Sequence, residues 1–373
     1  DIGLHLKKDD EGRLGFAVYI GGGQGRTPLV ARKVRDFLPE ADLLSYITAI
    51  MRVYNLYGRR DNKYKARIKI LVHETGIDTL RETIEAEWQA LKDSDLKLPD
   101  PDIRAIERYF ERPDLPARPE GLFALATDKQ ADPAFRAWVT RNVAAHAVDG
   151  YGAVTISLKP IGEAPGDASA DQMDAVADLA ERYAFDEIRV SHEQNLILPH
   201  VALADLRAVY DGLLAIGLAD ANAGLISDII ACPGLDYCAL ATARSIPVAQ
   251  EIGERFADPE RQRLIGDLKI KISGCINACG HHHVGEIGIL GVEKKGAELY
   301  QITLGGSAEE NTSIGDIVGR GFPPEDIVDA VETIIETYLG LRADETETFL
   351  QAYRRAGAQP FKDALYGDAH AAA

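Results

Sequence analysis

The four cysteines are the residues of this sequence whose type and spacing point most directly to chemistry. They lie within 48 residues of a 373-residue chain, in the pairs Cys232-x5-Cys238 and Cys275-x3-Cys279. Four thiols placed at random along the chain would almost never gather so closely. The pairs therefore predict one shared site that takes its thiols from two separate segments.

Four cysteines in two pairs are compatible with several kinds of thiol site. Inert buried cysteines are common in proteins, but the glycine and proline neighbours of these cysteines are typical of loops. Disulfides would require an oxidising compartment, which a long acidic chain with few cysteines does not suggest. Structural zinc prefers roughly two to four residues between paired cysteines, so only the second pair fits it. A cubane iron–sulfur cluster takes thiolates from two separated loops, and it fits best.

The overall charge narrows the class of protein. The chain has 41 Lys and Arg against 59 Asp and Glu, which gives a net charge of −18. Such a charge argues against nucleic acid as a partner, because phosphate binding depends on Lys and Arg. No apolar run approaches the ~20 residues of a membrane-spanning helix, so no membrane association is expected. The composition suits a cytoplasmic enzyme.

Two distant stretches of the chain read alike, which predicts an internal duplication. Matched positions are 284 residues apart, except at the Phe-Pro-Glu positions, where the offset differs by one residue. The matched positions are Phe16/Tyr300, Val18/Ile302, Ile20/Leu304, Gly21/Gly305, Gly22/Gly306, Phe37/Phe322, Pro39/Pro324, Glu40/Glu325, Leu43/Ile327, Ile47/Val331, Ile50/Ile334 and Tyr54/Tyr338. Each copy predicts a strand with alternating apolar residues, a glycine loop, and an amphipathic helix after Pro-Glu.

The duplication also extends backward along the chain. Residues 2–4 match residues 287–289, and the cysteine-bearing segment 269–280 lies upstream of the second copy. Its counterpart in the first copy would precede Asp1. The chain is therefore expected to start partway through the first copy.

The middle of the chain predicts further elements. Lys63, Lys65, Arg67 and Lys69 alternate with apolar or aromatic residues, which predicts a strand with one cationic face. That face is either a solvated sheet surface or a surface for an anionic cofactor, substrate or acidic redox partner. Leu80, Ile84, Trp88 and Leu91 predict an amphipathic helix, and the proline-rich stretch 99–119 predicts a linker. Residues 150–218 predict two helices and short strands in a ferredoxin-like arrangement.

The cysteine surroundings resemble one known family. The segments 231–238 (Ala-Cys-Pro-Gly-Leu-Asp-Tyr-Cys) and 273–280 (Ser-Gly-Cys-Ile-Asn-Ala-Cys-Gly) are similar to the paired signatures of the siroheme-dependent sulfite and nitrite reductases. Gln194-Asn195 resembles the glutamine–asparagine turn that follows the ferredoxin-like unit in that family. The duplicated glycine loops resemble its pseudo-twofold architecture. The resemblance covers essentially the whole chain.

The resemblance implies cofactors, reaction and partners. It implies that all four cysteines hold a [4Fe-4S] cluster, and that Cys279 also bridges to the iron of a siroheme. It implies six-electron reduction of sulfite to sulfide, with reduction of nitrite to ammonia as the first alternative. The electron donor would be either an NADPH flavoprotein subunit or a ferredoxin. A non-catalytic iron–sulfur or structural metal-binding fragment, and a corrin-biosynthesis oxygenase of the same superfamily, are further alternatives.

Other residues were assigned to the cofactors with the resemblance in view. Candidate siroheme contacts are Asn277, Gln194, Asn195, Gly305, Gly306, Arg26 and Arg244. A cationic pocket is expected because siroheme and its substrates are anionic, and the 63–69 strand, Lys269 and Lys271 are candidates to line it. The family's principal anion-binding arginines and lysines have no matching position in this chain. The run His281–His283 is interpreted first as packing, with one histidine donating a proton or hydrogen bond near the cofactor as the alternative.

The predicted fold class is α+β, with a pseudo-twofold sulfite/nitrite reductase architecture. A ferredoxin-like unit would accompany the α/β domains that bind siroheme and [4Fe-4S]. The predicted divisions are the rest of the first repeat at 1–98, a linker at 99–119, and the ferredoxin-like unit at 120–220. The second repeat with the cysteines follows at 221–345, and a C-terminal helix and tail at 346–373.

Overall fold

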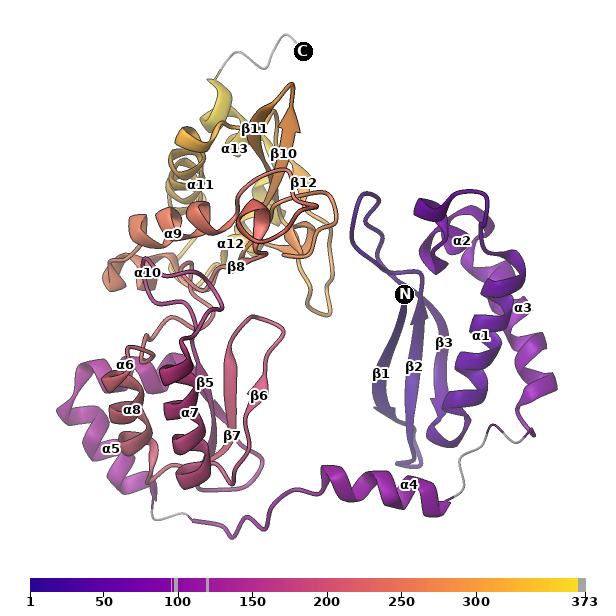
Figure 1. Cartoon of the computed structure of the whole chain (residues 1–373), viewed down its shortest axis with the longest axis horizontal. Coiled ribbons are helices and arrows are strands. Elements are labelled where there is room, and N and C mark those ends of the chain that lie inside the picture. Colours follow the sequence, from indigo (N-terminus) through magenta and orange to yellow (C-terminus); the bar gives the residue numbers. More distant parts are fainter. Residues whose placement is uncertain (95, 97–99, 119–120, 368–373) are drawn as a thin grey trace. The chain divides into compact units, whose positions relative to one another are not determined.

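A computed structural model describes residues 1–94, 96, 100–118 and 121–367 (Figure 1). The predicted boundaries at 98/99 and 119/120 and the end of the tail at 368–373 lie outside these residues. The chain divides into two compact units, Asp1–Arg112 and Pro113–Ala373. No helix of the described residues is long and apolar enough to cross a bilayer.

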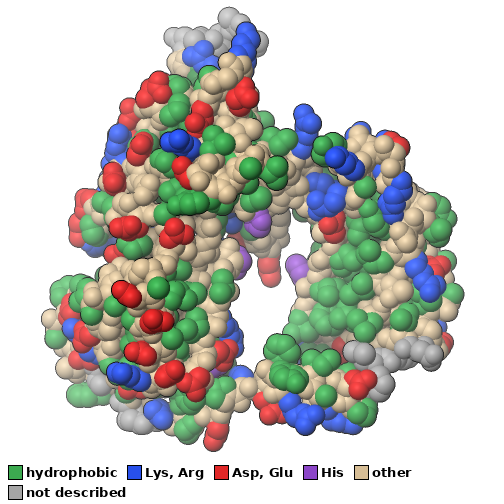
Figure 2. Space-filling model, in the orientation of Figure 1, with side chains coloured by type: hydrophobic (Ala, Val, Ile, Leu, Met, Phe, Trp, Pro, Cys, Tyr) green, Lys and Arg blue, Asp and Glu red, His purple; other side chains and the backbone are tan. Residues whose placement is uncertain are grey.

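Unit 1 contains an antiparallel sheet in the order β1-β2-β3, with helices packed on it. The strands are β1 (Ile2–Lys8), β2 (Leu14–Ile20) and β3 (Arg32–Pro39). The helices are η1 (Glu40–Asp42), α1 (Leu43–Tyr57), η2 (Lys63–Lys65), α2 (Ile68–Thr75) and α3 (Ile77–Leu91), followed by α4 (Asp100–Glu107) and η3 (Arg108–Phe110). Figure 2 shows hydrophobic side chains gathered over β1 and β2, where Leu4, Leu6 and Leu14 are exposed.

The apolar stripe predicted for the helix at 80–91 is confirmed. Leu80, Ile84, Trp88 and Leu91 are the buried residues of α3, and they pack in one cluster with α1 and the sheet. The indole of Trp88 also donates a hydrogen bond to Ser45 Oγ on α1 at 3.0 Å. The spacing of three or four residues between apolar positions therefore predicted the buried face of α3 correctly.

The predicted strand at Lys63–Lys69 is wrong. Residues Lys63–Lys65 form the 3-10 helix η2, which the Asn62 side chain caps, and the helix α2 begins at Ile68. Ile68, Leu71 and Val72 have helical spacing and all pack in the core of unit 1, so burial of this face overrode the alternation of charges. Lys69 is 5% exposed, and its ammonium donates to the carbonyls of Gln24 and Thr27. It therefore holds the glycine loop that follows β2.

The first part of unit 2 is an antiparallel sheet in the order β4-β5-β7-β6, with helices packed against it. Its strands are β4 (Val143–Ala145), β5 (Tyr151–Ile156), β6 (Arg189–Val190) and β7 (Leu196–Ala202). Its helices are α5 (Gly121–Ala131), α6 (Pro133–Asn142), α7 (Ala170–Tyr183) and α8 (Leu206–Ala215). The two helices and the short strands predicted within 150–218 are present, with boundaries that differ by a few residues.

The second part of unit 2 is a mixed sheet in the order β12-β11-β10-β9-β8. Its strands are β8 (Ile230–Ala231), β9 (Ile270–Ser273), β10 (Ile287–Lys294), β11 (Ala297–Leu304) and β12 (Asp316–Ile317). Its helices are η4 (Gly234–Asp236), α9 (Ile246–Arg255), α10 (Pro259–Ile265), η5 (His282–Val284), η6 (Pro324–Asp326), α11 (Ile327–Leu341), α12 (Phe349–Ala356) and α13 (Gln359–Tyr366). The strands β8, β9 and β10 run parallel, with α9 and α10 in the connection between β8 and β9.

The register of the two hairpins confirms the internal duplication. In unit 1, Ile2 pairs with Ile20 across β1 and β2. In unit 2, Ile287 pairs with Leu304 across β10 and β11, which is the equivalent pair. The first glycine after each hairpin has the same backbone conformation, with φ of 80° at Gly21 and 82° at Gly305. Each copy then continues through a 3-10 turn into a long helix, α1 or α11.

The duplication predicts matched effects of mutation on stability. Ile50 on α1 is 1% exposed and its equivalent Ile334 on α11 is 0% exposed. Truncation of either to alanine should lower the free energy of unfolding by about 2–5 kcal/mol, because each leaves a cavity in a packed core. Leu56→Ala on α1, at a side chain that is 73% exposed, should have almost no effect. Denaturant titrations of the three variants measure this, and a small loss for Ile334→Ala alone would contradict the equivalence.

Candidate iron–sulfur site

Two neighbouring parallel strands bring the cysteine segments together. Cys232 follows β8 directly, and Cys275 lies two residues after the end of β9. The two strands pair in parallel, with Ala231 opposite Ile272. Because the carboxyl ends of parallel strands lie at the same edge of a sheet, both cysteine loops leave the sheet side by side.

Hydrogen bonds join the two cysteine loops. The backbone N–H of Cys232 donates to the carbonyl of Ile272 at 3.1 Å, which continues the β8–β9 ladder by one residue. The N–H of Gly274 donates to Cys232 Sγ at 3.1 Å. This donor would become charge-assisted with a thiolate, so the loop is already arranged to stabilise the ligand form of Cys232.

Two glycines allow the loops to pack backbone against backbone. Gly234 has a φ of 59°, and a Cβ there would lie 2.7 Å from the backbone nitrogen of Ser245. A Cβ on Gly274 would lie 2.6 Å from the carbonyl oxygen of Ala243 and 2.8 Å from the Cα of Gly234. A side chain at Gly274 would therefore push the two cysteine loops apart, and one at Gly234 would disrupt the first loop against the segment at Ser245.

The four thiols differ in their exposure. Cys232 and Cys275 are buried, Cys238 is partly buried and Cys279 is exposed. Partial desolvation raises the pKa of the Cys279 thiol, and the charges of Cys232, Cys275 and Cys238 raise it further. The other three thiols therefore lie within electrostatic reach of Cys279, which is the exposed member of the four.

The donor set suits an iron–sulfur cluster. The four thiols come from two loops at one sheet edge, and a cubane cluster takes thiolates from separated loops. Structural zinc prefers about two to four residues between paired cysteines, which only the second pair offers. Within the described ranges, no group of three or more His, Cys, Asp or Glu side chains is close enough to hold a metal ion.

The second cysteine loop is tightly wound. Ala278 has a φ of 59° and His281 a φ of 58°. These are left-handed backbone conformations that residues other than glycine rarely adopt. A Cβ on Gly280 would overlap the carbonyl oxygen of Ile272. Asn277 lies between the two cysteines of this loop with its side chain exposed. It is therefore available to a group bound outside the loop.

The histidine run after the cysteines has one buried member. His282 is fully buried, its ring lies 3.9 Å from that of His283, and neither of its ring nitrogens has a hydrogen-bond partner within the described chain. Burial, followed by the charges of His283 and His281, lowers the pKa of His282 to about 3. His282 is therefore a neutral, packed side chain near pH 7.

The glutamine and asparagine singled out in the sequence contact protein groups. The carboxamide of Gln194 forms two hydrogen bonds with the backbone of Ala231, and Asn195 bonds to the buried pair Lys159–Asp228. Gly305 and Gly306 are buried. A Cβ on Gly306 would lie 2.5 Å from the carbonyl oxygen of Gly285. Gly306 therefore lets the loop after β11 pack against the segment that follows the second cysteine loop, whereas Gly305 makes room for the ring of Tyr353.

The lysines and arginines expected to line one cationic pocket differ in exposure and in ion pairing. Arg26 belongs to the glycine loop of unit 1, where it is exposed. Arg244 lies beside the first cysteine loop, 62% exposed, with its Nε 3.8 Å from Asp236. Lys269 forms ion pairs with Glu193 and Glu309 at 3.0 Å each. Lys271 on β9 is 4% exposed, and burial lowers its pKa.

Residues that support the cysteine loops were missed at the sequence level. Ser245 is fully buried, and its hydroxyl donates to the carbonyl of Cys232 at 2.5 Å. Lys159 and Asp228 form a buried ion pair with a distance of 2.5 Å. The sequence signal for Gly274 is its position directly before Cys275, and that for Gly234 is its position two residues after Cys232. Ser245, Lys159 and Asp228 had no such signal, because they are distant from the cysteines in sequence or ordinary in type.

A partly buried carboxyl, that of Glu286, lies beyond the histidine run. Burial raises the pKa of Glu286 to about 7, against the opposing effect of the Lys269 backbone N–H, which donates to its carboxyl oxygen at 2.8 Å. Glu286 therefore keeps its proton between about pH 4.5 and about pH 7, where an ordinary glutamate is ionised.

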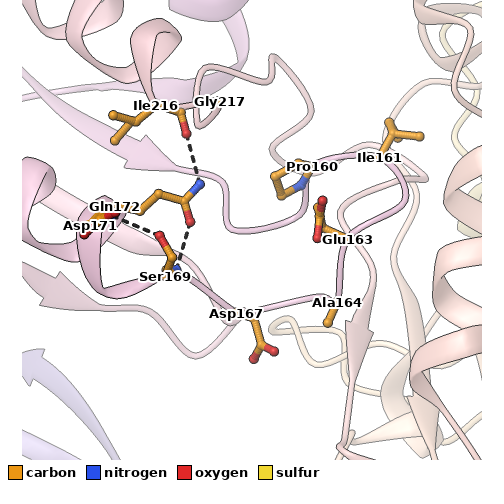
Figure 3. Close-up of a pocket in the computed structure, with 11 residues that line it drawn as sticks. Pro160, Ile161, Glu163, Ala164, Asp167, Ser169, Asp171, Gln172, Ile216 and Gly217 are labelled. Carbon is orange, nitrogen blue, oxygen red and sulfur yellow. Dashed lines mark hydrogen bonds between the residues drawn. The ribbon is translucent and has the colours of Figure 1, made fainter.

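An open pocket in unit 2 is separate from the cysteines. Its wall includes the carboxylates of Glu163, Asp167 and Asp171 (Figure 3). Gln172 is fixed there by hydrogen bonds to Ile216 and Ser169. None of the four cysteines lines this pocket, so it adds nothing to the thiol site.

Comparison with known families identifies the chain. The nitrite and sulphite reductase 4Fe-4S domain matches residues 1–92 and 223–367, and the nitrite/sulfite reductase ferredoxin-like half domain matches residues 148–216. The chain therefore belongs to the nitrite and sulfite reductase family. The cofactors of this family are a [4Fe-4S] cluster and a siroheme, as the sequence resemblance implied. The four converging thiols described above fit the cluster.

Two curated relatives illustrate the range of the family. The chain is 29% identical over 358 residues to "Sulfite reductase [ferredoxin] 2" of Mycolicibacterium paratuberculosis, covering 92% of this chain and 56% of the relative. It is 26% identical over 352 residues to "Ferredoxin--nitrite reductase, chloroplastic" of Betula pendula, covering 90% and 53%. The chain thus spans about half the length of the curated relatives it matches.

Solved structures share the fold. The Mycobacterium tuberculosis NirA protein matches with a TM-score of 0.73 and 24% identity, over 97% of this chain and 61% of that one. Dissimilatory sulfite reductase I matches with a TM-score of 0.50 and 12% identity, over 59% and 70%. These likenesses confirm the predicted α+β class of sulfite/nitrite reductases with a ferredoxin-like unit.

The packing of the cysteine loops predicts the effect of a single methyl group. Gly274→Ala should sharply lower the iron and acid-labile sulfide retained by anaerobically purified protein, because the new Cβ collides with the backbone of the first cysteine loop. Gly340→Ala on α11 is the matched control, since a Cβ there meets nothing within 4 Å. Equal iron content in both variants would show that the close contact at Gly274 does not position the thiols.

The raised pKa of Glu286 predicts a pH-dependent stability. Its ordinary pKa is 4.5, so the unfolded chain releases this proton before the folded chain does, and stability is lost as pH rises from about 4.5 through about 7. Glu286→Gln should remove this loss, so its stability relative to wild type should increase between pH 5 and pH 8. Glu345→Gln, at an exposed carboxylate, is the control. Denaturant titrations at both pH values measure the difference, and a pH-independent difference for Glu286→Gln would contradict the assignment.

Proposed function

We propose that the chain is the cofactor-binding part of a siroheme-dependent reductase that carries out the six-electron reduction of sulfite to sulfide, with nitrite reduction to ammonia as the alternative. The convergence of four thiols from two loops at one sheet edge carries this proposal. Relatives named for sulfite reduction and for nitrite reduction both match along most of the chain, and sulfite is named more often.

In this proposal Cys232, Cys238, Cys275 and Cys279 hold the cluster, and Cys279 also bridges to the siroheme iron. The exposure of the thiols supports the choice of Cys279. Cys232 and Cys275 are buried, whereas Cys279 is exposed, so a macrocycle outside the loop could reach Cys279 most directly. Asn277 lies in the same loop with its side chain exposed, which keeps it as a candidate contact of the siroheme.

When bound, the cluster and siroheme would pass electrons to the substrate anion and polarise its oxygen atoms. The chain's own residues would orient this pair and set the charge around it. Arg244 is exposed beside the first cysteine loop and remains a candidate contact of a siroheme carboxylate. We retain Arg26, Gly305, Gly306, Gln194 and Asn195 as candidates for the cofactor surroundings. The ion pairs of Lys269 leave it little free charge to offer an anion.

A ferredoxin is the proposed electron donor, because the names of the relatives specify it. An NADPH flavoprotein subunit is the alternative, and the proposed location is the cytoplasm. Turnover of the loaded protein with reduced ferredoxin, and separately with NADPH and a flavoprotein, distinguishes the two donors.

The absorption spectrum of anaerobically purified protein tests the cofactor assignment. Wild type and His283→Ala should show the intense Soret and red bands of siroheme together with the cluster. Cys279→Ser should lose the siroheme bands and the reduction of sulfite or nitrite by a reduced dye. Cluster absorption without siroheme in the wild type would favour a non-catalytic iron–sulfur protein, and absence of iron and acid-labile sulfide would exclude the proposal.

A further inference from the structure

The turn between β6 and β7 of the ferredoxin-like part is built around a strained residue. Gln194 has a φ of 57°, a left-handed conformation that usually requires glycine or asparagine. The surrounding turn is closed by hydrogen bonds, because the Ser191 hydroxyl accepts from the backbone N–H groups of Glu193 and Asn195. Local strain at a non-glycine residue persists only where the surroundings fix it, so the turn itself calls for an explanation.

The side chain of Gln194 explains the turn. Its Nε2 donates to the carbonyl of Ala231 at 2.8 Å, and its Oε1 accepts from the N–H of Ala231 at 3.0 Å. The carboxamide therefore pairs with Ala231 as a neighbouring strand would. β8 is the edge strand of its sheet, so this pairing occupies an edge that would otherwise be open.

A buried ion pair anchors the same turn to the cluster-bearing part. The ammonium of Lys159 donates to Asp228 Oδ1 at 2.5 Å, to Asn195 Oδ1 at 3.0 Å and to the carbonyl of Glu193. Asn195 also donates to Asp228 at 3.1 Å. The side chains of Lys159 and Asp228 are 2% and 5% exposed, so their separation would leave charges unpaired in the interior. The turn is thus bonded to Asp228, which lies two residues before the start of β8.

Cys232 follows Ala231 directly, which gives this clamp a role at the thiol site. We propose that Gln194 is a positioning residue that fixes the end of β8, and thereby the Cys232 thiol, for the iron–sulfur cluster. This inference rests on the proposed function, because it requires Cys232 to be a cluster ligand. Through Gln194 the ferredoxin-like part governs how firmly the cluster is retained, although the cluster's four thiols all belong to the other part of the unit.

The expected effect is a change in the rate at which the cluster is lost. Residues that orient a metal ligand commonly change metal affinity by about 10- to 100-fold when they are mutated. Ile272 and Ser245 still hold Cys232 when Gln194 is removed, so the lower end of that range applies. Gln194→Ala should therefore release iron to excess chelator roughly tenfold faster than wild type.

The matched control is Gln172→Ala. Gln172 lies in the same ferredoxin-like part, and its carboxamide also forms one donated and one accepted hydrogen bond with backbone groups, those of Ile216 and Ser169 (Figure 3). It caps α7, and its hydrogen-bond partners Ser169 and Ile216 lie outside both cysteine loops. A general loosening of the ferredoxin-like part would affect both variants, whereas a positioning role affects Gln194→Ala alone.

A second variant separates positioning from folding. In Gln194→Glu an ionised carboxylate can accept from the Ala231 N–H but repels the Ala231 carbonyl, whereas the protonated acid can form both bonds. The excess rate of iron release over wild type should therefore shrink as pH is lowered. Gln194→Ala should show no such rescue, since it lacks the side chain at every pH.

The experiment follows iron release from anaerobically purified, cluster-loaded full chain by the visible absorption of a chelator complex, with melting temperatures measured in parallel. Faster release by Gln194→Ala than by Gln172→Ala, with pH rescue of Gln194→Glu, supports the inference. Wild-type release rates in both Gln194 variants overturn it and leave the proposed function intact. A wild-type chain that holds no iron or sulfide overturns the proposed function, and the inference with it. If Gln194→Ala does not fold, the test rests on Gln194→Glu alone. An excess rate of iron release from Gln194→Glu that does not shrink as pH is lowered then overturns the inference.

Discussion

The parallel pairing of β8 with β9 is the contact on which the thiol site depends. It joins two segments about forty residues apart and directs both toward the same sheet edge, so that the cysteines after each strand meet. The close approach of Gly234 to Gly274 and the hydrogen bond from Gly274 to Cys232 Sγ are consequences of this pairing. The helices α9 and α10 complete the crossover, and their buried residues pack in one core cluster with those of the strands.

The internal duplication gives two copies of one scaffold. Both copies keep the same hairpin register and the same glycine conformation after the second hairpin strand. In the second copy, β10 also pairs with β9, which leads into the second cysteine loop. The shared scaffold therefore comes from the core packing of a hairpin and a helix, and in the second copy a neighbouring strand adds the cysteine loop.

The sequence predicted correctly those elements in which buried or reactive residues recur at regular or short spacing. The stripe on α3, the two repeat helices and the paired cysteines were all visible because each depends on residue type at regular or short spacing. It failed at Lys63–Lys69, where alternating charges outweighed the helical spacing of Ile68, Leu71 and Val72. It identified Gln194 but not its contact with Ala231, because that contact depends on a left-handed turn meeting a strand 37 residues away. Tertiary contacts between ordinary polar residues leave no pattern in a single sequence.

The long connection between β8 and β9 has a consequence for the order of assembly. Small zinc modules take their metal while they fold, since the ligands of one ion lie close together in sequence. Here Cys232 and Cys275 meet only after the chain between them has closed through α9 and α10. The crossover from β8 to β9 must therefore close before the two pairs of thiols can act as one set of ligands. Closing this loop costs conformational entropy, which the pairing of β8 with β9 and the packing of the crossover helices must offset.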